Sequence, residues 1–269
     1  MKRSHPILIA VVGLSLALLY LPLLAVAMFS VNAAKIGLKW EGFSLKWFGE
    51  LFSNEHILTR AGNTLLLAVV STAIATVLGV MIALGMQRGL WRKGSRRMLD
   101  TVLDLPVISP DILFAAALVV AFKVWRLIAP ASELYGLGAM VIGHVTFQIS
   151  FVTLVVRSRL VTMGRTLSEA AYDLNASRGY VLRKVTLPLL MPAIVAGAML
   201  AFTLSLDDFV ISFFTTSPKS ETLPIYIYSS LRRGLSPQVH ALSTLIVLAN
   251  VILIVVIERL TRSSHATAE

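Results

Sequence analysis

Six long apolar segments, separated by shorter polar ones, limit what this chain can fold into. Each segment is close to the roughly 20 residues that an α-helix needs to cross the hydrocarbon core of a bilayer. Because backbone groups cannot stay unpaired in lipid, such segments must form helices. The sequence therefore predicts an all-α integral membrane protein with six transmembrane helices. The expected spans are Ile7–Phe29, Thr64–Met86, Val107–Phe122, Leu137–Val156, Leu189–Phe209 and Ala241–Ile257.

The third expected span is the shortest, and Pro106, Pro110 and Asp111 lie at its start. In two other spans, small residues recur every four positions, a spacing that lets helices approach closely. These small residues are Ala75, Gly79 and Ala83 in the second span and Ala193, Gly197 and Ala201 in the fifth.

The basic residues between the spans predict the orientation of the chain. With the N-terminus inside, 15 of the 24 Lys and Arg residues fall on the cytosolic side and 9 on the outer side. Cytosolic loops carry the excess of Lys and Arg, so both termini are expected in the cytosol. A cleaved signal peptide is the alternative for the first span, with Ala25-Val26-Ala27 as the cleavage site. The apolar run there is longer than the roughly 7–15 residues of such a core.

Composition supports a membrane location and excludes several kinds of chemistry. The chain is 57% hydrophobic and only 14% charged, against about 25% charged residues in soluble domains. The net charge is +10, but the basic residues are distributed over the segments between the spans rather than along one helix. Membrane topology explains this distribution better than nucleic-acid binding does. Without cysteine there is no disulfide or thiolate metal site, and the five histidines lack zinc-site spacing. No phosphate-binding loop motif is present, so any ATP must be bound by another polypeptide.

A polar segment between the fourth and fifth spans, Glu169–Asn175, has the pattern of a short amphipathic helix. Thr166 and Glu169 have the spacing of a capping box. Asn175 lies where the helix should end, and asparagine tolerates the left-handed conformation common there. A second helix, ended by Pro188, is expected to follow. One apolar stripe at i, i+3, i+4 and i+7 suits docking into a groove on another protein, and it consists of Leu167, Ala170, Ala171 and Leu174.

This segment resembles the EAA coupling loop of ABC-importer permeases, whose pattern is EAA-x3-G-x9-I-x-L-P. Glu169-Ala170-Ala171 and Val185-Thr186-Leu187-Pro188 match the pattern, with Asn175 in place of glycine and Val185 in place of isoleucine. The resemblance implies a type I ABC importer permease (MetI-like) fold with a cytosolic coupling helix. It implies that the ATPase-coupling residues are Glu169, Ala170, Ala171 and Asn175, with the two alanines at the closest approach. An ordinary amphipathic loop helix is the alternative.

Two adjacent acids, Asp207 and Asp208, lie near the outer end of the fifth span. They follow Pro188 by about 20 residues, a helical rise of about 30 Å, and the sequence stays apolar beyond them. A carboxylate there is costly unless it faces water, a cation or a partner, so a functional role is expected. The alternative is that the pair marks the solvated end of a helix. Because neighbours on a helix point in different directions, the two aspartates are expected to differ in role.

Several separated motifs resemble the polyamine (spermidine/putrescine) permeases of the same family. They are Trp40–Trp47, Gly143–Phe147, Phe202–Phe209, Leu223–Ser229 and Gly234–Pro237. The resemblance covers nearly the whole chain and implies the second of two non-identical permeases of a polyamine importer. Polyamines carry two or more ammonium groups, which carboxylates and aromatic faces can bind.

The acid pair and the resemblance together define an expected substrate path. Three of its members also have a structural alternative: Asp111 as a helix cap, Trp47 as an interfacial anchor and Ser205 as a partner of its own helix. The candidate path residues are Asp207, Asp208, Ser205, Phe202, Asp111 and Trp47. No catalytic residue and no metal site are expected.

The resemblance implies one transmembrane domain preceded by an anchor. Residues 1–59 are expected to hold the first transmembrane helix and a periplasmic loop. Residues 60–257 are expected to form the ABC importer transmembrane domain of five helices, with the coupling loop at about 158–187, and residues 258–269 a cytosolic tail. ATP and Mg are expected on a partner ATPase, and no cofactor in this chain.

The implied function is that of a permease subunit, not an enzyme, of an ATP-driven putrescine or spermidine importer. It would cross the bacterial inner (cytoplasmic) membrane several times. The expected partners are a second homologous permease subunit, an ABC ATPase dimer, a periplasmic polyamine-binding protein and the lipid bilayer, but no nucleic acid. The alternatives are the same architecture with another small substrate and, from another class, an ion-coupled secondary carrier, which would need no coupling loop.

Overall fold

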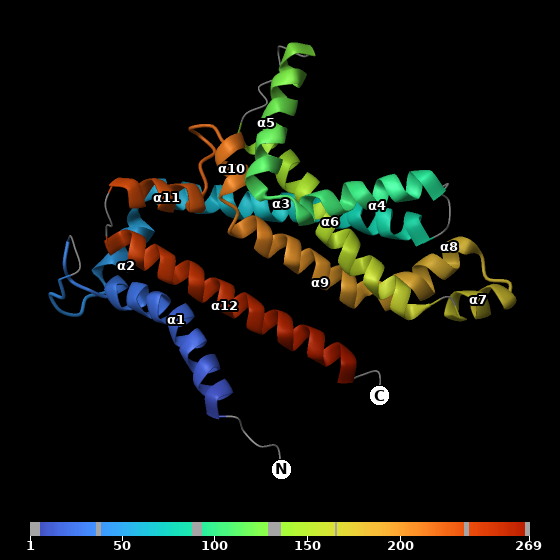
Figure 1. Ribbon diagram of the computed structural model, residues 1–269, viewed down its shortest axis with the longest axis horizontal. Coiled ribbons are helices and arrows are strands. Elements are labelled where there is room, and N and C mark those ends of the chain that lie inside the picture. Colours follow the sequence, from blue (N-terminus) through green and yellow to red (C-terminus); the bar gives the residue numbers. More distant parts are fainter. Residues whose placement is uncertain are drawn as a thin grey trace. The chain divides into compact units, whose positions relative to one another are not determined.

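Helices make up almost all of the chain that the computed structural model describes, which is residues 6–35, 39–87, 93–128, 136–164, 166–233 and 237–266. Within these residues the only β-structure is an isolated bridge between Asn32 and Phe43. The helices in chain order (Figure 1) are α1 (Pro6–Ser30), α2 (Lys46–Ser53), α3 (Glu55–Gln87), α4 (Lys93–Ile108), α5 (Asp111–Ile128), α6 (Leu137–Met163), α7 (Thr166–Asp173), α8 (Arg178–Val181), the π-helical turn η1 (Leu182–Thr186), α9 (Leu187–Leu206), α10 (Val210–Thr215), α11 (Leu223–Arg233) and α12 (Pro237–Ala266).

The chain divides into two compact units. The larger consists of Arg60–Ile225 with Val255–Glu269, and it contains α4 to α10 and most of α3. The smaller consists of Met1–Thr59 with Tyr226–Ile254, and it contains α1, α2 and most of α11. All of the coupling segment and both aspartates of the acid pair belong to the larger unit.

Four described helices are long and apolar enough to cross a membrane: α1, α3, α6 and the continuous helix Arg178–Leu206 formed by α8, η1 and α9. Helices α4 and α5 supply a fifth span only if they count together, because the chain bends by 116° between them. In α12 the described apolar stretch, Pro237–Ile252, is shorter. The described residues therefore confirm an all-helical membrane protein, with four or five candidate spans by length and composition.

The third and fifth expected spans differ from the prediction. Val107–Phe122 is not one straight helix: α4 ends at Ile108 and α5 begins at Asp111, with Pro110 between them. Proline lacks an N–H and disfavours a helical conformation in the residue before it, so the helix ends there. The fifth span ends at Leu206 rather than at Phe209, because the chain turns at the acid pair and begins α10.

Pro188 does not end a helix, so that prediction is wrong. It is the second residue of α9, which continues directly from η1. In η1 the Leu187 N–H bonds to the Leu182 carbonyl five residues back. This wider turn immediately precedes Pro188, whose missing N–H and ring would disrupt a regular α-helical turn.

The core of the larger unit lies between α3, α6 and α9. A β-carbon added at Gly79 would lie 2.8 Å from the Val152 side chain, so glycine allows α3 and α6 to approach closely. Ala75, Ala83 and Ala201 are fully buried, which confirms the prediction that small residues lie in helix contacts. The buried cluster at this junction consists of Ala83, Val152, Val156, Leu160, Leu190 and Ala201.

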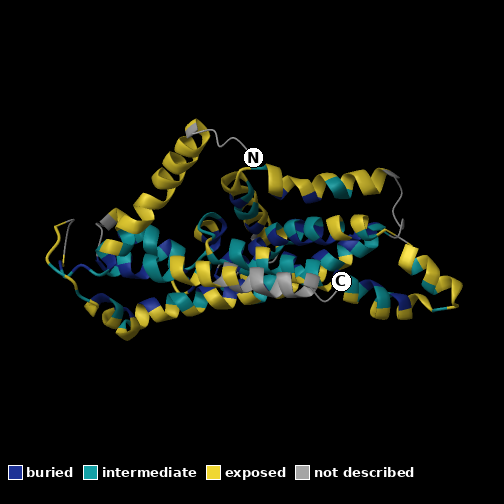
Figure 2. Cartoon of the chain, turned by 90° about the horizontal axis from the view of Figure 1, so that it is seen from below, coloured by how far each residue is buried: buried dark blue, intermediate teal, exposed yellow. Residues whose placement is uncertain are grey.

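Exposed residues occur along many of the helices (Figure 2), and many of these residues have large apolar side chains. In α1, for example, Ile7 is 77% exposed and Leu18 is 69% exposed. In water, apolar surfaces this large mark interaction sites. In a chain with several candidate membrane spans, they are the expected surface toward lipid and neighbouring helices.

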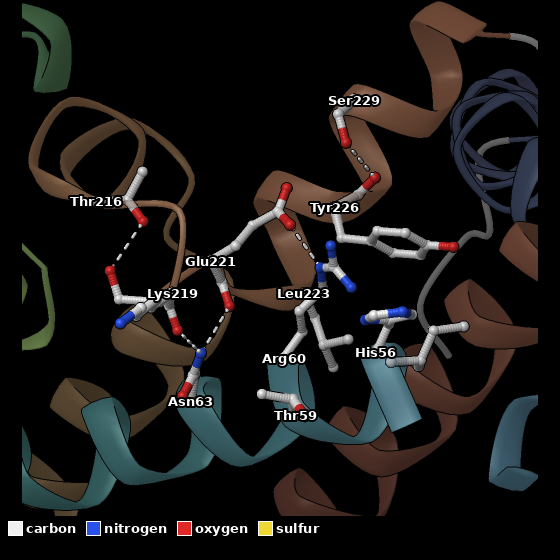
Figure 3. Close-up of polar contacts among 12 residues, drawn as sticks. His56, Thr59, Arg60, Asn63, Thr216, Lys219, Glu221, Leu223, Tyr226 and Ser229 are labelled. Carbon is white, nitrogen blue, oxygen red and sulfur yellow. Dashed lines mark hydrogen bonds and ion pairs between the residues drawn. The ribbon is translucent and has the colours of Figure 1, made fainter. Parts of the chain in front are cut away.

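Polar contacts fix the loop between α10 and α11 to the beginning of α3 (Figure 3). The Arg60 guanidinium binds the Glu221 carboxylate, and the Asn63 side chain donates to two carbonyls of the loop. The Leu223 N–H donates to Thr64 Oγ1 at 2.9 Å. These contacts join residues about 160 positions apart in sequence, and periodicity alone did not predict them.

Candidate functional site

Helix α7 presents an apolar face that the described part of the chain does not cover. None of its residues is buried. Leu167 is 53% exposed and Leu174 is 84% exposed, while Ala170 is exposed and Ala171 half-buried. An isolated eight-residue helix is marginal in water, so such a helix depends on packing against something else. The face therefore suits docking to another protein.

The end of α7 is closed by Asn175 in the left-handed conformation, with φ of 58°. The Asn175 N–H donates to the Tyr172 carbonyl at 2.8 Å, and the Ala176 N–H donates to the Ala171 carbonyl at 3.1 Å. This pair of bonds is the Schellman pattern, which satisfies carbonyls at a helix end. The predicted left-handed Asn175 is confirmed.

The beginning of α7 differs from the predicted capping box. Thr166 is the first helical residue rather than the cap. Among the described residues, the Glu169 N–H does not donate to the Thr166 hydroxyl, and the Thr166 N–H does not donate to the Glu169 carboxylate. Glu169 is exposed in the first turn of α7, where a negative charge interacts favourably with the helix dipole.

A cavity of about 770 Å³ lies beside α7, against the end of α3. Its lining combines apolar side chains such as Leu84 and Leu182 with the charged Glu169 and Arg178. Ser168 and Tyr172, which line the cavity from α7, are each two residues from Ala170, so the cavity faces the other side of the helix from Ala170.

Asp207 and Asp208 occupy the break between α9 and α10, in different surroundings. Asp207 caps the end of α9, where its N–H bonds to the Thr203 carbonyl at 3.4 Å, and its side chain is exposed. The Asp208 side chain is only 14% exposed. Its carboxylate accepts from the N–H groups of Ile211 and Ser212, at 3.3 and 2.8 Å, and so caps the beginning of α10.

His144, two turns into α6, binds Asp208 in a buried polar cluster. Its Nε2 lies 3.1 Å from Asp208 Oδ2 and 3.0 Å from Ser212 Oγ. Its Nδ1 lies 2.7 Å from Ser205 Oγ, which in turn lies 3.3 Å from Ser71 Oγ on α3. The cluster joins α3, α6, α9 and α10, and it connects the predicted residues Ser205 and Asp208 through His144.

His144 is absent from the candidate residues predicted from sequence, although its position carries a signal. An ionisable residue inside an apolar span is expensive and marks a functional or paired site by default. His144 is the one histidine within an expected span, the fourth, Leu137–Val156, whereas His240 lies at the edge of the sixth.

Among the described residues, the other candidate path residues make no hydrogen bond to this cluster. Phe202 is a half-buried residue of α9, and Asp111 is the exposed first residue of α5. Trp47, in the smaller unit, is only 7% exposed, and its indole N–H donates to the Asn32 carbonyl at 2.7 Å. The Lys46 ammonium lies 4.4 Å from the Trp47 ring centroid, so this ring already contacts a cation of its own chain.

These elements belong to a known class of membrane protein. Residues 75–265 match the family of binding-protein-dependent transport system inner membrane components. The chain belongs to this family: it is an inner-membrane permease subunit of an ABC importer and not itself the ATPase.

Particular members of the family are similar to nearly the whole chain. The spermidine/putrescine transport system permease protein PotC of Escherichia coli (strain K12) is 36% identical, over 91% of this chain and 90% of PotC. The putrescine transport system permease protein PotI of the same strain is 35% identical, over 88% of this chain and 84% of PotI. A solved bacterial ABC transporter that imports the acidic polysaccharide alginate shares the fold, with a TM-score of 0.77 and 17% identity over 96% of this chain and 94% of that one.

Proposed function

We propose that this chain is one permease subunit of an ATP-driven polyamine importer. The observation that carries the proposal is the similarity to PotC, which extends over about nine-tenths of both chains at 36% identity. The exposed carboxylate of Asp207, at the end of a membrane-spanning helix, supplies the chemistry that a polycation requires.

The proposed complex contains a second homologous permease, an ABC ATPase dimer and a periplasmic polyamine-binding protein. ATP and Mg bind to the ATPase. Closure of the ATPase is transmitted through α7, where Glu169, Ala170 and Ala171 contact it and Asn175 ends the helix. The uncovered apolar face of α7 supports this role.

Substrate released by the binding protein is proposed to meet Asp207 directly, while Asp208 shapes the same corner as a cap. Ser205 acts through His144, and Phe202 offers an aromatic face nearby in sequence. Asp111 is a second candidate ligand, since it is exposed and unpaired among the described residues. Trp47 is proposed to anchor the outer helix α2, because its ring is buried. The transport cycle is alternating access to a site within the membrane.

Six spans with both termini in the cytosol of a bacterium complete the proposal. Here α4 and α5 count as one broken span, and α12 is the sixth, since its 30 residues rise about 45 Å. The excess of Lys and Arg on the inner side sets the orientation.

Cysteine labelling of this cysteine-free chain tests the orientation. A cysteine at Ser53 in α2 is expected to react with a membrane-impermeant reagent in spheroplasts, because α2 lies outside. A cysteine at Ser95 in α4 is expected to react only after permeabilisation. Both serines are exposed, so accessibility depends on the side of the membrane. Labelling of both positions in intact spheroplasts would contradict the topology.

Uptake by the reconstituted complex tests the function. Proteoliposomes are prepared with both permeases and the ATPase, and the binding protein is added outside. They are expected to accumulate labelled putrescine or spermidine only when ATP is enclosed in the lumen. Excess unlabelled polyamine should compete, and excess sulfate should not. ATP-dependent uptake of another solute with no effect of polyamines would favour the same architecture with a different substrate. Uptake that follows an ion gradient without the ATPase would favour a secondary carrier.

A further inference from the structure

We propose that His144 is a positioning residue for cation recognition: it holds Asp208 as the cap of α10 and thereby leaves Asp207 as the carboxylate that receives the polyamine. The inference rests on the proposed function, which it deepens. It assigns a role to a buried histidine about 60 residues away in sequence from both acids.

The burial of His144 shows that its partners determine its orientation. The side chain is only 2% exposed, and both ring nitrogens have partners within 3.1 Å. Burying an imidazole without partners would cost free energy, so the ring is held where both nitrogens are satisfied.

The partners also assign the proton on the ring. The Asp208 carboxylate can only accept, so Nε2 of His144 carries the hydrogen that it donates. Nδ1 lies 2.7 Å from the Ser205 hydroxyl, which can either donate to this nitrogen or accept from it. Ser205 Oγ can in turn accept from the Ser71 hydroxyl at 3.3 Å. These contacts form one continuous set of hydrogen bonds from α3 through α9 and α6 to the carboxylate.

These contacts occupy most of the acceptor capacity of Asp208. It accepts from His144 Nε2 and from the N–H groups of Ile211 and Ser212. A carboxylate has about four acceptor positions, so little capacity remains for a substrate. Asp207 is exposed instead, and so it is available to a cation.

Close packing beside His144 fixes α10 against α6. A β-carbon added at Gly143 would lie 2.7 Å from Ile211 Cγ2 and 3.2 Å from Leu118 Cδ1. Gly143 and His144 thus contact Ile211 and Ser212, the residues whose N–H groups Asp208 caps. If His144 no longer binds Asp208, this junction loosens and the corner that carries Asp207 moves. The expected consequence is weaker recognition of the substrate rather than loss of the whole fold.

Two substitutions of similar polarity separate this role from simple packing. In His144→Gln the longer amide can still donate to Asp208 from about the position of Nε2. In His144→Asn the shorter amide reaches only as far as Nδ1. We expect His144→Asn to raise the half-saturating polyamine concentration about tenfold in the reconstituted complex, the effect of losing one charge-assisted bond. His144→Gln is expected to recover most of the wild-type value.

The control is Thr146→Val on the exposed face of α6, where the hydroxyl bonds only to its own helix at Ile142. It should leave the half-saturating concentration unchanged. If His144 acts through Asp208, the double variant His144→Asn/Asp208→Asn should raise the half-saturating concentration by much less than the product of the two single-variant increases. The proposal would be overturned if the double variant showed the full product of the two single-variant increases. It would also be overturned by equal half-saturating concentrations in the Gln, Asn and wild-type complexes.

Two further outcomes are distinguishable. If the His144→Asn complex does not assemble, Ser205→Ala removes the hydrogen-bond partner of Nδ1 while keeping the ring. It should raise the half-saturating concentration about threefold, as expected for the loss of one hydrogen bond. An unchanged value in assembled Ser205→Ala complexes would also overturn the role of His144. If wild-type complexes do not transport polyamine at all, the proposed function fails, whereas polyamine transport that is insensitive to His144 overturns only this inference.

Discussion

Replacing Asp207 with asparagine is expected to raise the half-saturating polyamine concentration by about ten- to a hundredfold, with a normal amount of assembled complex. The substitution keeps the shape of the side chain and removes its charge. Asp207 is exposed, and its recorded hydrogen bond to Thr203 uses the backbone N–H, which the substitution preserves. Initial uptake rates over a range of putrescine and spermidine concentrations measure the effect.

The adjacent Asp208 provides the matched comparison. Asp208→Asn keeps one oxygen that can accept from Ser212 but weakens the contact with His144, so α10 loses part of its cap. We expect this variant to lower the amount of assembled complex more than Asp207→Asn does, with a smaller increase in the half-saturating concentration. Unchanged uptake per assembled complex in both single variants and in the double variant would refute a role of the acid pair in the polyamine path.

The different expectations for the two acids show what sequence could and could not predict. The apolar periodicity identified the long helices, because lipid burial demands helices of a certain length. Sequence does not predict the break after Leu206, because the residues beyond Asp208 are apolar and cannot be distinguished from a continuation of the fifth span. The helix ends there because Asp208 caps α10 and His144 binds Asp208, and such a contact between distant residues leaves no periodic signal.

Sequence preferences predict a helix end correctly where only neighbouring residues determine it. Asn175 adopts the left-handed conformation that its position predicted, because helix ends are determined by a few neighbouring backbone groups. Pro188 does not end its helix as the local preference of proline predicts. The wider turn η1 precedes it, and the helix continues into α9. Its environment depends on how α9 enters the core between α3 and α6, which one sequence does not reveal.

The site residues could be proposed from sequence only as types of residue at suggestive positions. An adjacent acid pair indicated that the two side chains would differ, but not which one would be exposed. Asp208 is the less exposed of the two because it binds His144 of α6 and Ser212 of α10. These residues are about 60 and 4 positions away from Asp208 in the chain.

Replacing Ala170 with tryptophan is expected to lower ATP-driven polyamine uptake by about 5- to 150-fold, the effect of roughly 1–3 kcal/mol of overpacking at a docked surface. Ala170 is exposed on a helix without buried residues, so the indole has room in the free subunit and folding should be unaffected. The proposed groove on the ATPase leaves no such room.

The effect of Ala170→Trp should appear as reduced ATPase stimulation by the binding protein and reduced co-purification of the ATPase, while the second permease stays bound. Tyr172→Trp is the control, because at about 100° per residue it places the same indole roughly on the opposite side of α7. Tyr172 is already aromatic and 44% exposed, so this variant should transport normally. An Ala170→Trp complex with normal uptake and normal ATPase stimulation would remove the assignment of α7 as the coupling helix, because an exposed helix that tolerates an indole at its smallest position is not inserted in a groove.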